Sequence, residues 1–221
     1  MRTGVVVFPG TNRERDAAML LQRLDGKAPT MLWHTETTLP ALDLVVLPGG
    51  FSYGDYLRTG AMAAHSPIMA AVRAHAARGG LVLGICNGFQ ILCETQLLPG
   101  ILLRNNHLKF NCKFVDLRVE NTRTPFTHAY AQGQVVHAPV AHGDGNYFAD
   151  DATLNDLEQN HQVVFRYGHN PNGSARNIAG IINKQGNVLG LMPHLENAAE
   201  PLHGHVDGAT MFASVLSKMA A

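Results

Sequence analysis

The sequence has no excess of charge of either sign, because its 221 residues include 17 basic and 17 acidic side chains. A chain without net charge lacks the electrostatic footprint of a protein that binds nucleic acid or an anionic membrane. It also has no apolar run of transmembrane length, and the apolar stretch near its N-terminus is too short for the core of a signal peptide. We therefore expect a small neutral ligand or another protein as the partner, with no nucleic acid and no membrane.

Cysteine is scarce, with three residues in the chain. Three cysteines cannot all pair within one molecule, and two of them, Cys86 and Cys93, fall on one predicted helix too far apart for a disulfide. This usage favours a reducing compartment, so we expect a cytoplasmic protein. No metal is expected either, because no set of ligands stands at metal-binding spacing.

The chain also lacks any linker that would divide it. It has no Pro/Ser-rich stretch, no block of like charge and no internal repeat, which favours a single domain over residues 1–221. A Gly-x-x-x-x-Gly-Lys phosphate loop is absent too, so no ATP chemistry is expected in this chain.

Continuous apolar runs alternate with helical segments through the first half of the sequence. The predicted strands are residues 5–8, 30–33, 42–47 and 81–85. The predicted helices run from a cap at Thr11 or Asn12 to Leu24, and from Ser66-Pro67 to a stop at Gly79-Gly80. This alternation indicates an α/β fold of three layers, an open and mostly parallel sheet with helices on both faces. Binding sites in such sheets lie at the carboxyl ends of the strands.

Beyond residue 100 the pattern changes to short strands that alternate apolar and polar residues. We expect additional strands at 112–120, 134–140, 162–167, 178–182 and 188–192, followed by a closing helix from Val206 to Met219.

The run from Leu81 to Gln90 carries the clearest functional signal. An apolar strand leads directly into Gly84-Ile85-Cys86-Asn87-Gly88, and a helical segment follows. Such a strand-to-helix elbow is so tight that the residues two before and two after the nucleophile must be small. A free cysteine is usually a buried apolar residue, and Cys93 is interpreted as core packing. The glycines around Cys86 instead indicate a catalytic nucleophile.

A cysteine nucleophile needs a base, and His194 is the best of the twelve histidines. It follows the predicted strand 188–192, which would end at the same sheet edge as the elbow. Glu196 would lie on the same face as His194 if the extended conformation continued, and could hold the imidazole in place. Pro48-Gly49-Gly50 follows another strand, and the backbone N–H groups of Gly50 and Asn87 could form an oxyanion hole.

These features resemble the class I, triad-type glutamine amidotransferases, whose flavodoxin-like domains carry a Pro-Gly-Gly loop, a Gly-x-Cys-x-Gly elbow and a late Pro-His-x-Glu. Within that class the chain is similar to the family of glutaminase subunits of phosphoribosylformylglycinamidine synthase. The similarity covers nearly the whole chain and rests on residues 51–58, 84–90, 118–121, 141–145, 170–174 and 178–181.

The resemblance implies that Cys86 attacks the side-chain amide of glutamine, that His194 transfers protons and that Glu196 orients His194. It implies substrate contact for Gln90, although a glutamine on a helix surface can be purely structural. It also implies a large synthetase subunit and a small accessory subunit as partners. The synthetase would use the ammonia, with ATP and magnesium on its side, to convert formylglycinamide ribonucleotide to the amidine.

Two positions depart from the common family motif Pro-His-Pro-Glu-Arg. Leu195 replaces the second proline, which removes a rigid φ between base and orienter, and Asn197 replaces arginine, which removes a charge. We expect both changes to affect catalytic efficiency and to leave the identity of the catalytic residues unchanged. The segment Asn105-Asn106-His107 also differs from the Ser-rich segment usual in the family, so no substrate contact is assigned to it.

For other residues the sequence does not decide between a structural and a functional role. His142 is more typical of a structural hydrogen-bonding residue than of a metal ligand, with a role at the site rim or in partner coupling as the alternative. Tyr53, Asp55 and Arg58 form either a subunit-facing loop or a polar helix entrance. Two other protein classes remain: a peptidase or other cysteine hydrolase on a related scaffold, disfavoured by Asn87 after the nucleophile, and a silent docking module.

Overall fold

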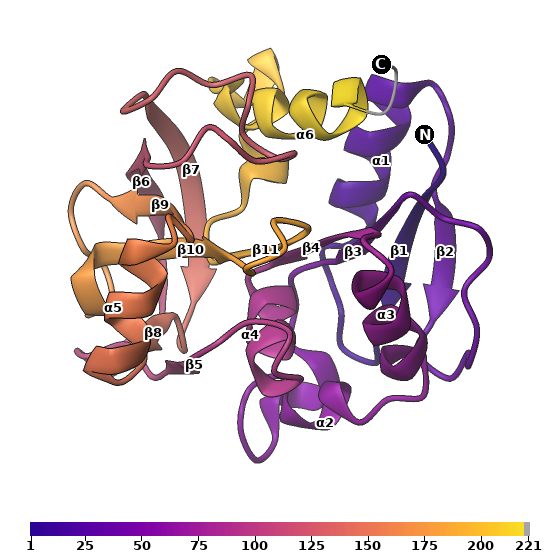
Figure 1. Cartoon of the computed structure of the whole chain (residues 1–221), viewed down its shortest axis with the longest axis horizontal. Helices are drawn as coiled ribbons and strands as arrows, with labels where there is room; N and C mark the ends of the chain where they lie inside the picture. The colour runs from indigo at the N-terminus through magenta and orange to yellow at the C-terminus, as the bar shows by residue number, and fades with distance from the viewer. Residues whose placement is uncertain (219–221) are drawn as a thin grey trace.

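The computed structural model describes residues 1–218, and a nine-stranded sheet forms its centre (Figure 1). The strand order is β2-β1-β3-β4-β11-β10-β9-β6-β7. Pairing is parallel from β2 to β11 and antiparallel from β11 to β7. The α/β class and the flanked, mostly parallel sheet expected from the sequence are confirmed. Four of the five additional strands expected in the second half lie in the antiparallel part, and the fifth forms β11, which pairs in parallel with β4.

The parallel part consists of strands with little polar character. They are β2 (Thr30–Trp33), β1 (Thr3–Val7), β3 (Leu44–Leu47), β4 (Leu81–Ile85) and β11 (Val188–Leu191). Helices cover both faces, with α1 (Glu14–Asp25) and α6 (Asp207–Lys218) on one, and α2 (Ala61–Ala64), α3 (Ile68–Ala77) and α4 (Asn87–Glu94) on the other (Figure 1). Burial on both faces explains why β3 and β4 are apolar throughout.

The antiparallel part extends the same sheet. It contains β10 (Ile178–Ile182), β9 (Val163–Tyr167), β6 (Asn111–Val119) and β7 (Val135–His142), with β7 at the edge. A turn at residues 183–187 reverses the chain between β10 and β11, so that β11 runs parallel to β4. Beside this part lie a two-stranded sheet of β5 (Ile101–Leu103) and β8 (Asn146–Phe148), and helix α5 (Asp151–Gln159). The 3₁₀ turns are η1 (Ser52–Asp55), η2 (Ala175–Asn177), η3 (Leu195–Asn197) and η4 (Pro201–His203).

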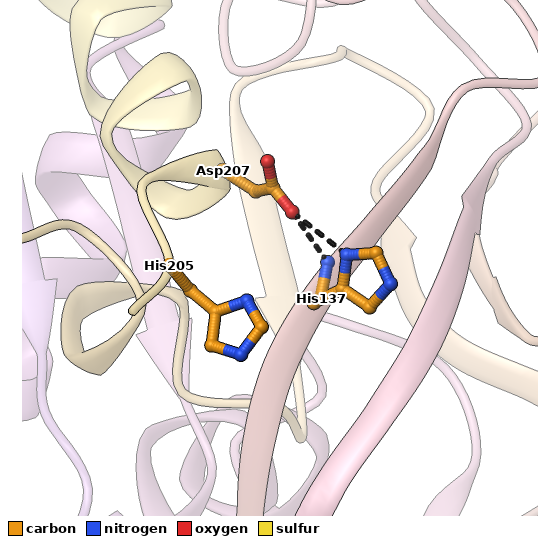
Figure 2. Close-up of side chains that lie close together, drawn as sticks. All are labelled: His137, His205 and Asp207. Atoms are coloured by element: carbon orange, nitrogen blue, oxygen red, sulfur yellow. Dashed lines mark hydrogen bonds and ion pairs between the residues drawn. The ribbon is translucent and has the colours of Figure 1, made fainter. Parts of the chain in front are cut away.

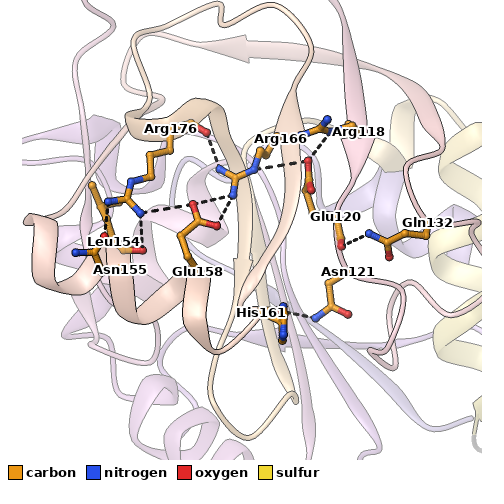
Figure 3. A network of polar contacts seen from close by, with 10 residues as sticks. All are labelled: Arg118, Glu120, Asn121, Gln132, Leu154, Asn155, Glu158, His161, Arg166 and Arg176. Carbon is orange, nitrogen blue, oxygen red and sulfur yellow. Dashed lines mark hydrogen bonds and ion pairs between the residues drawn. The ribbon is translucent and has the colours of Figure 1, made fainter.

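Helix α5 is joined to the sheet by a network of ion pairs (Figure 3). Arg166 on β9 donates from Nη2 to both carboxylate oxygens of Glu158 on α5, at 2.7 and 2.8 Å. Its Nε lies 3.6 Å from Glu120, which also pairs with Arg118. Most of the Arg166 side chain is buried, so this network replaces water around a charge that is shielded from solvent.

Some sequence-based boundaries were wrong. The N-cap of α1 is Arg13, and neither Thr11 nor Asn12 caps it; the Thr11 hydroxyl instead accepts the N–H of Phe8 at 3.0 Å. The short elements α2, β5 and β8 and helix α5 were not predicted. The expected end of the closing helix, Met219, lies outside the described residues. None of the helices within residues 1–218 combines the length and apolar character needed to cross a membrane.

Candidate active site

Cys86 lies between the end of β4 and the start of α4, as the glycine pattern predicts. Its backbone has φ 52° and ψ −104°, a strained conformation for a residue with a side chain. Its N–H donates to the carbonyl of Leu191 on β11 at 2.8 Å, and its carbonyl accepts from Gln90 in the first turn of α4. The neighbouring strand and the helix therefore hold the backbone of Cys86 from two sides.

The glycines of the elbow are required by close backbone contacts. A Cβ atom on Gly88 would lie 1.9 Å from the carbonyl oxygen of Leu47 on β3. A Cβ atom on Gly84 would lie 2.7 Å from the backbone of Gly88. Any larger residue would force α4 away from the sheet, so these glycines set the tight approach that the sequence pattern suggested.

His194 follows β11, and the register pairs Leu191 with Ile85, so the histidine and the cysteine leave neighbouring strands at the same edge. The N–H of His194 donates to Pro139 on β7 at 2.8 Å. Nδ1 of the ring lies 2.7 Å from Oε1 of Glu196, and both side chains are buried. The extended conformation expected here is wrong: residues 195–197 form η3, and this 3₁₀ turn brings the carboxylate to the ring.

The environment of His194 favours the charged ring. Burial alone lowers the pKa of His194, but the Glu196 carboxylate and then the Cys86 sulfur raise it above its ordinary value. The Nε2 atom is buried and has no hydrogen-bond partner among the described residues. Gly49 packs against the ring, because a Cβ atom there would lie 2.6 Å from Cε1 of His194. The imidazole is thus fixed with one nitrogen on Glu196 and the other available for chemistry.

The two predicted oxyanion donors lie beside this pair. Gly50 has φ 151°, and the hydrogen bonds of its bridge to Thr11 are made by the flanking residues, which leaves the Gly50 N–H out of the ladder. Asn87 is the first residue of α4, whose N–H has no acceptor within its own helix. Both donors therefore remain available to an oxygen that develops negative charge.

The amide of Gln90 is bonded within the protein. Its Nε2 donates to the carbonyl of Asp144 at 2.6 Å, and its Oε1 accepts from Nδ2 of Asn87 at 2.9 Å. The Asn87 side chain in turn accepts the N–H of Ser52 at 3.2 Å. Gln90 therefore ties the elbow helix to the 143–145 loop, and its substrate contact remains a prediction.

His142 ends β7 within a buried hydrogen-bond network. The backbone N–H of Ser174 donates to Oδ1 of Asn172 at 3.1 Å, which fixes the orientation of that amide. Nδ2 of Asn172 consequently donates to Nε2 of His142 at 3.0 Å. Burial first, and then the charge of His194, lower the pKa of His142 to about 3. His142 is therefore neutral, with its proton on Nδ1, and its ring cannot act as a second base through Nε2.

The sequence did not identify most members of this network. Asn105 donates to the His142 carbonyl at 2.9 Å and accepts the N–H of Gly145 at 3.1 Å, so its amide supports the 143–145 loop. Asn172 and Ser174 also bond the carbonyl of Gly145. The sequence analysis named the run 170–174 and the segment 105–107, but neither pattern shows what these residues contact.

The structure shows the surroundings of Tyr53, Asp55 and Arg58, whose roles the sequence left open. The Tyr53 hydroxyl lies 2.8 Å from both His34 and Ser66, and Arg58 forms two bonds to Glu94. Asp55 is half-buried, and its Oδ1 has no partner in the described part of the chain.

Within η3, Leu195 is fully buried, and Asn197 donates to Asp16 on α1 at 2.9 Å. Asn197 thus links the 3₁₀ turn to α1. Cys93 is buried in the core, and its burial raises the pKa of the thiol well above the ordinary value.

A strained cysteine at a strand-to-helix elbow, beside a buried His-Glu pair and two backbone donors, defines a glutamine amidotransferase domain. A family model described as a CobB/CobQ-like glutamine amidotransferase domain matches residues 1–211.

Two curated relatives match over nearly all of both chains. The phosphoribosylformylglycinamidine synthase subunit PurQ of Rhizobium meliloti (strain 1021) is 58% identical, over the full length of both chains. The same subunit of Nitrobacter hamburgensis is 57% identical over 99% of this chain and 98% of its own. In the structure of PurLQS from Thermotoga maritima, one chain is 47% identical with a TM-score of 0.90, covering 99% of this chain and 98% of that one. The chain belongs to the PurQ family of phosphoribosylformylglycinamidine synthase subunits, which confirms the resemblance noted in the sequence.

Proposed function

We propose that this chain hydrolyses glutamine through Cys86, His194 and Glu196 and supplies the ammonia to a synthetase subunit. The observation that carries the proposal is the meeting of Cys86 with the His194–Glu196 pair at the ends of two paired strands. The family membership adds the reaction class, and the absence of a phosphate loop leaves ATP chemistry to the partner.

The reaction begins when the Cys86 sulfur attacks the side-chain amide carbon of glutamine and His194 holds the thiol proton on Nε2. The carbonyl oxygen becomes negative and is bound by the N–H groups of Gly50 and Asn87. Collapse of this intermediate breaks the C–N bond, His194 gives its proton to the nitrogen, and ammonia leaves. Cys86 then carries a thioester.

Hydrolysis of the thioester reuses the same groups. His194 takes a proton from water, the resulting hydroxide attacks the carbonyl carbon, and the sulfur leaves as glutamate is released. Glu196 keeps the proton-accepting nitrogen directed at the reaction because it holds Nδ1.

The released ammonia would be used by the large synthetase subunit to convert formylglycinamide ribonucleotide to the amidine in purine biosynthesis. We assign ATP and magnesium to that subunit, include a small accessory subunit in the complex and place the reaction in the cytoplasm. The name PurLQS of the Thermotoga maritima assembly supports a multi-subunit complex.

The test uses the complex of this chain with its synthetase and accessory subunits. Cys86→Ala should abolish amidine formation from glutamine and leave formation from ammonium chloride unchanged. Glu196→Gln should lower glutamate release on the order of 10²- to 10⁴-fold, since the orienting charge is lost while the shape is kept. Glu200→Gln, in an exposed pair with Arg23, is the matched control. Equal loss of both nitrogen sources in Cys86→Ala would contradict the proposed division of labour.

A further inference from the structure

Three side chains of types that can ligate a metal lie together at the edge strand of the sheet. His137 lies on β7, His205 precedes α6, and Asp207 is the first residue of α6. One ligand atom from each lies within 4.8 Å of the others. Figure 2 shows the Asp207 carboxylate directed at the His137 ring, with the His205 ring beside it.

The His137 ring faces a carboxylate at each nitrogen. Nδ1 lies 3.1 Å from Oδ2 of Asp207, and Nε2 lies 3.4 Å from Oδ1 of Asp116. With a cation between Nδ1 and the Asp207 carboxylate, the proton of a neutral imidazole would lie on Nε2, where it faces Asp116. A carboxylate on the outer nitrogen is the usual partner of a metal-bound histidine.

The third ligand is held close to this pair. The His205 ring lies 5.5 Å from the His137 ring and 4.5 Å from the ring of Phe114, measured between centroids. Tetrahedral zinc, with bonds of about 2.0–2.1 Å, needs ligand atoms roughly 3.4 Å apart. The 3.1 Å separation of His137 Nδ1 and Asp207 Oδ2 is close to this spacing, and a nitrogen of His205 lies within 4.8 Å of a ligand atom of each.

We propose that His137, His205 and Asp207 bind a divalent transition metal such as Zn²⁺, with water in the fourth position and Asp116 as the outer partner of His137. Nitrogen and oxygen donors of this kind suit Zn²⁺, Co²⁺ and Ni²⁺ better than Mg²⁺ or Ca²⁺. The backbone N–H of His137 also donates to Asp207 at 2.9 Å, so the ion would fasten the start of α6 to the edge strand.

The experiment uses the full chain, purified without a histidine tag and freed of metal with a chelator. Titration with CoCl₂ should give saturable d–d absorption at one equivalent, without the near-ultraviolet charge-transfer band of a thiolate ligand. ZnCl₂ should compete for the same site and raise the melting temperature. This spectrum separates the proposed site from metal held by Cys86 or Cys112.

Two variants remove one ligand each. His205→Ala and Asp207→Asn should each weaken Co²⁺ binding at least about tenfold, because one of three protein ligands is lost. Asn at position 207 retains an acceptor for the His137 N–H, so this variant should fold normally. His65→Ala, an exposed histidine at the end of α2, should bind as the unaltered chain does. Absence of saturable binding, or unchanged binding in both ligand variants, would overturn the proposal.

Discussion

Asp55 shows how a single residue can be left poorly solvated beside a functional site. Burial, and then the nearby charge of Asp144, raise its pKa to about 6. Its Oδ1 atom is buried without a hydrogen-bond partner among the described residues. Residues 53, 55 and 57 also have positive φ, so this carboxyl group belongs to a strained segment next to the Pro-Gly-Gly loop.

The raised pKa of Asp55 predicts a stability effect with a defined sign. The folded chain binds this proton more tightly than the unfolded chain, so stability is full below about pH 4 and falls as the pH rises through about 6. Asp55→Asn removes the charge that causes this loss of stability. It should therefore raise the free energy of unfolding by about 1 kcal/mol at pH 8, after allowance for partial exposure. Urea unfolding at pH 4 is the internal control, where the two chains should agree. A similar difference at both pH values would contradict the prediction.

At the scale of elements, the antiparallel part of the sheet depends on polar contacts as well as on its core. Arg166 joins β9 to α5 through Glu158 and reaches Glu120, while its guanidinium also donates to the carbonyl of Arg176 at 2.7 Å (Figure 3). The two carboxylates would lose their shared partner if this side chain were removed.

Arg166→Ala should therefore lower the free energy of unfolding by about 1–3 kcal/mol, because charged hydrogen bonds in a largely buried network are lost. Lys184→Ala is the matched control. Lys184 pairs with Asp156 on the same helix, but both side chains are exposed, and the expected change is within about 0.5 kcal/mol. The free energies of unfolding of the unaltered chain and the two variants are measured by denaturant unfolding. Equal effects of the two substitutions would show that the network contributes no more than a surface pair.

At the scale of the whole molecule, exposed apolar side chains follow the loop that carries Gly50. Tyr56 is 74% exposed and Leu57 is 92% exposed, and both follow the loop that carries Gly50. Phe51 on this loop stacks with Phe110 at 6.4 Å, and both rings are half-exposed. A protein of a family of synthase subunits is expected to use such a surface in its complex.

Leu57→Asp should lower glutamate release stimulated by a limiting amount of synthetase about tenfold, because an exposed apolar contact becomes a desolvated charge. The melting temperature should not change, and excess synthetase should restore the rate. Leu202→Asp is the control, since Leu202 is equally exposed but lies on η4. If both variants respond to synthetase as the unaltered chain does, Leu57 lies outside the interface.

The local rules of the chain determined the class of fold and the position of the cysteine elbow. Apolar runs separated by helices are sufficient to predict a buried parallel sheet. Gly84 and Gly88 indicate an elbow, because no other residue fits between backbones so close together. The Pro-His-x-Glu run likewise placed a histidine and a carboxylate after a strand. These features depend on neighbours within a few residues, so the sequence alone was sufficient for them.

The tertiary structure decided what depends on residues far apart in the chain. Only the pairing of β11 with β4 brings His194 to the edge that carries Cys86, and only the 3₁₀ turn directs Glu196 to the ring. The tautomer of His142 is set by Asn172, and the proposed metal ligands come from β7 and the start of α6, although the sequence led us to expect no metal. Such contacts follow from sheet order and loop packing, which hydrophobic periodicity and short motifs do not encode.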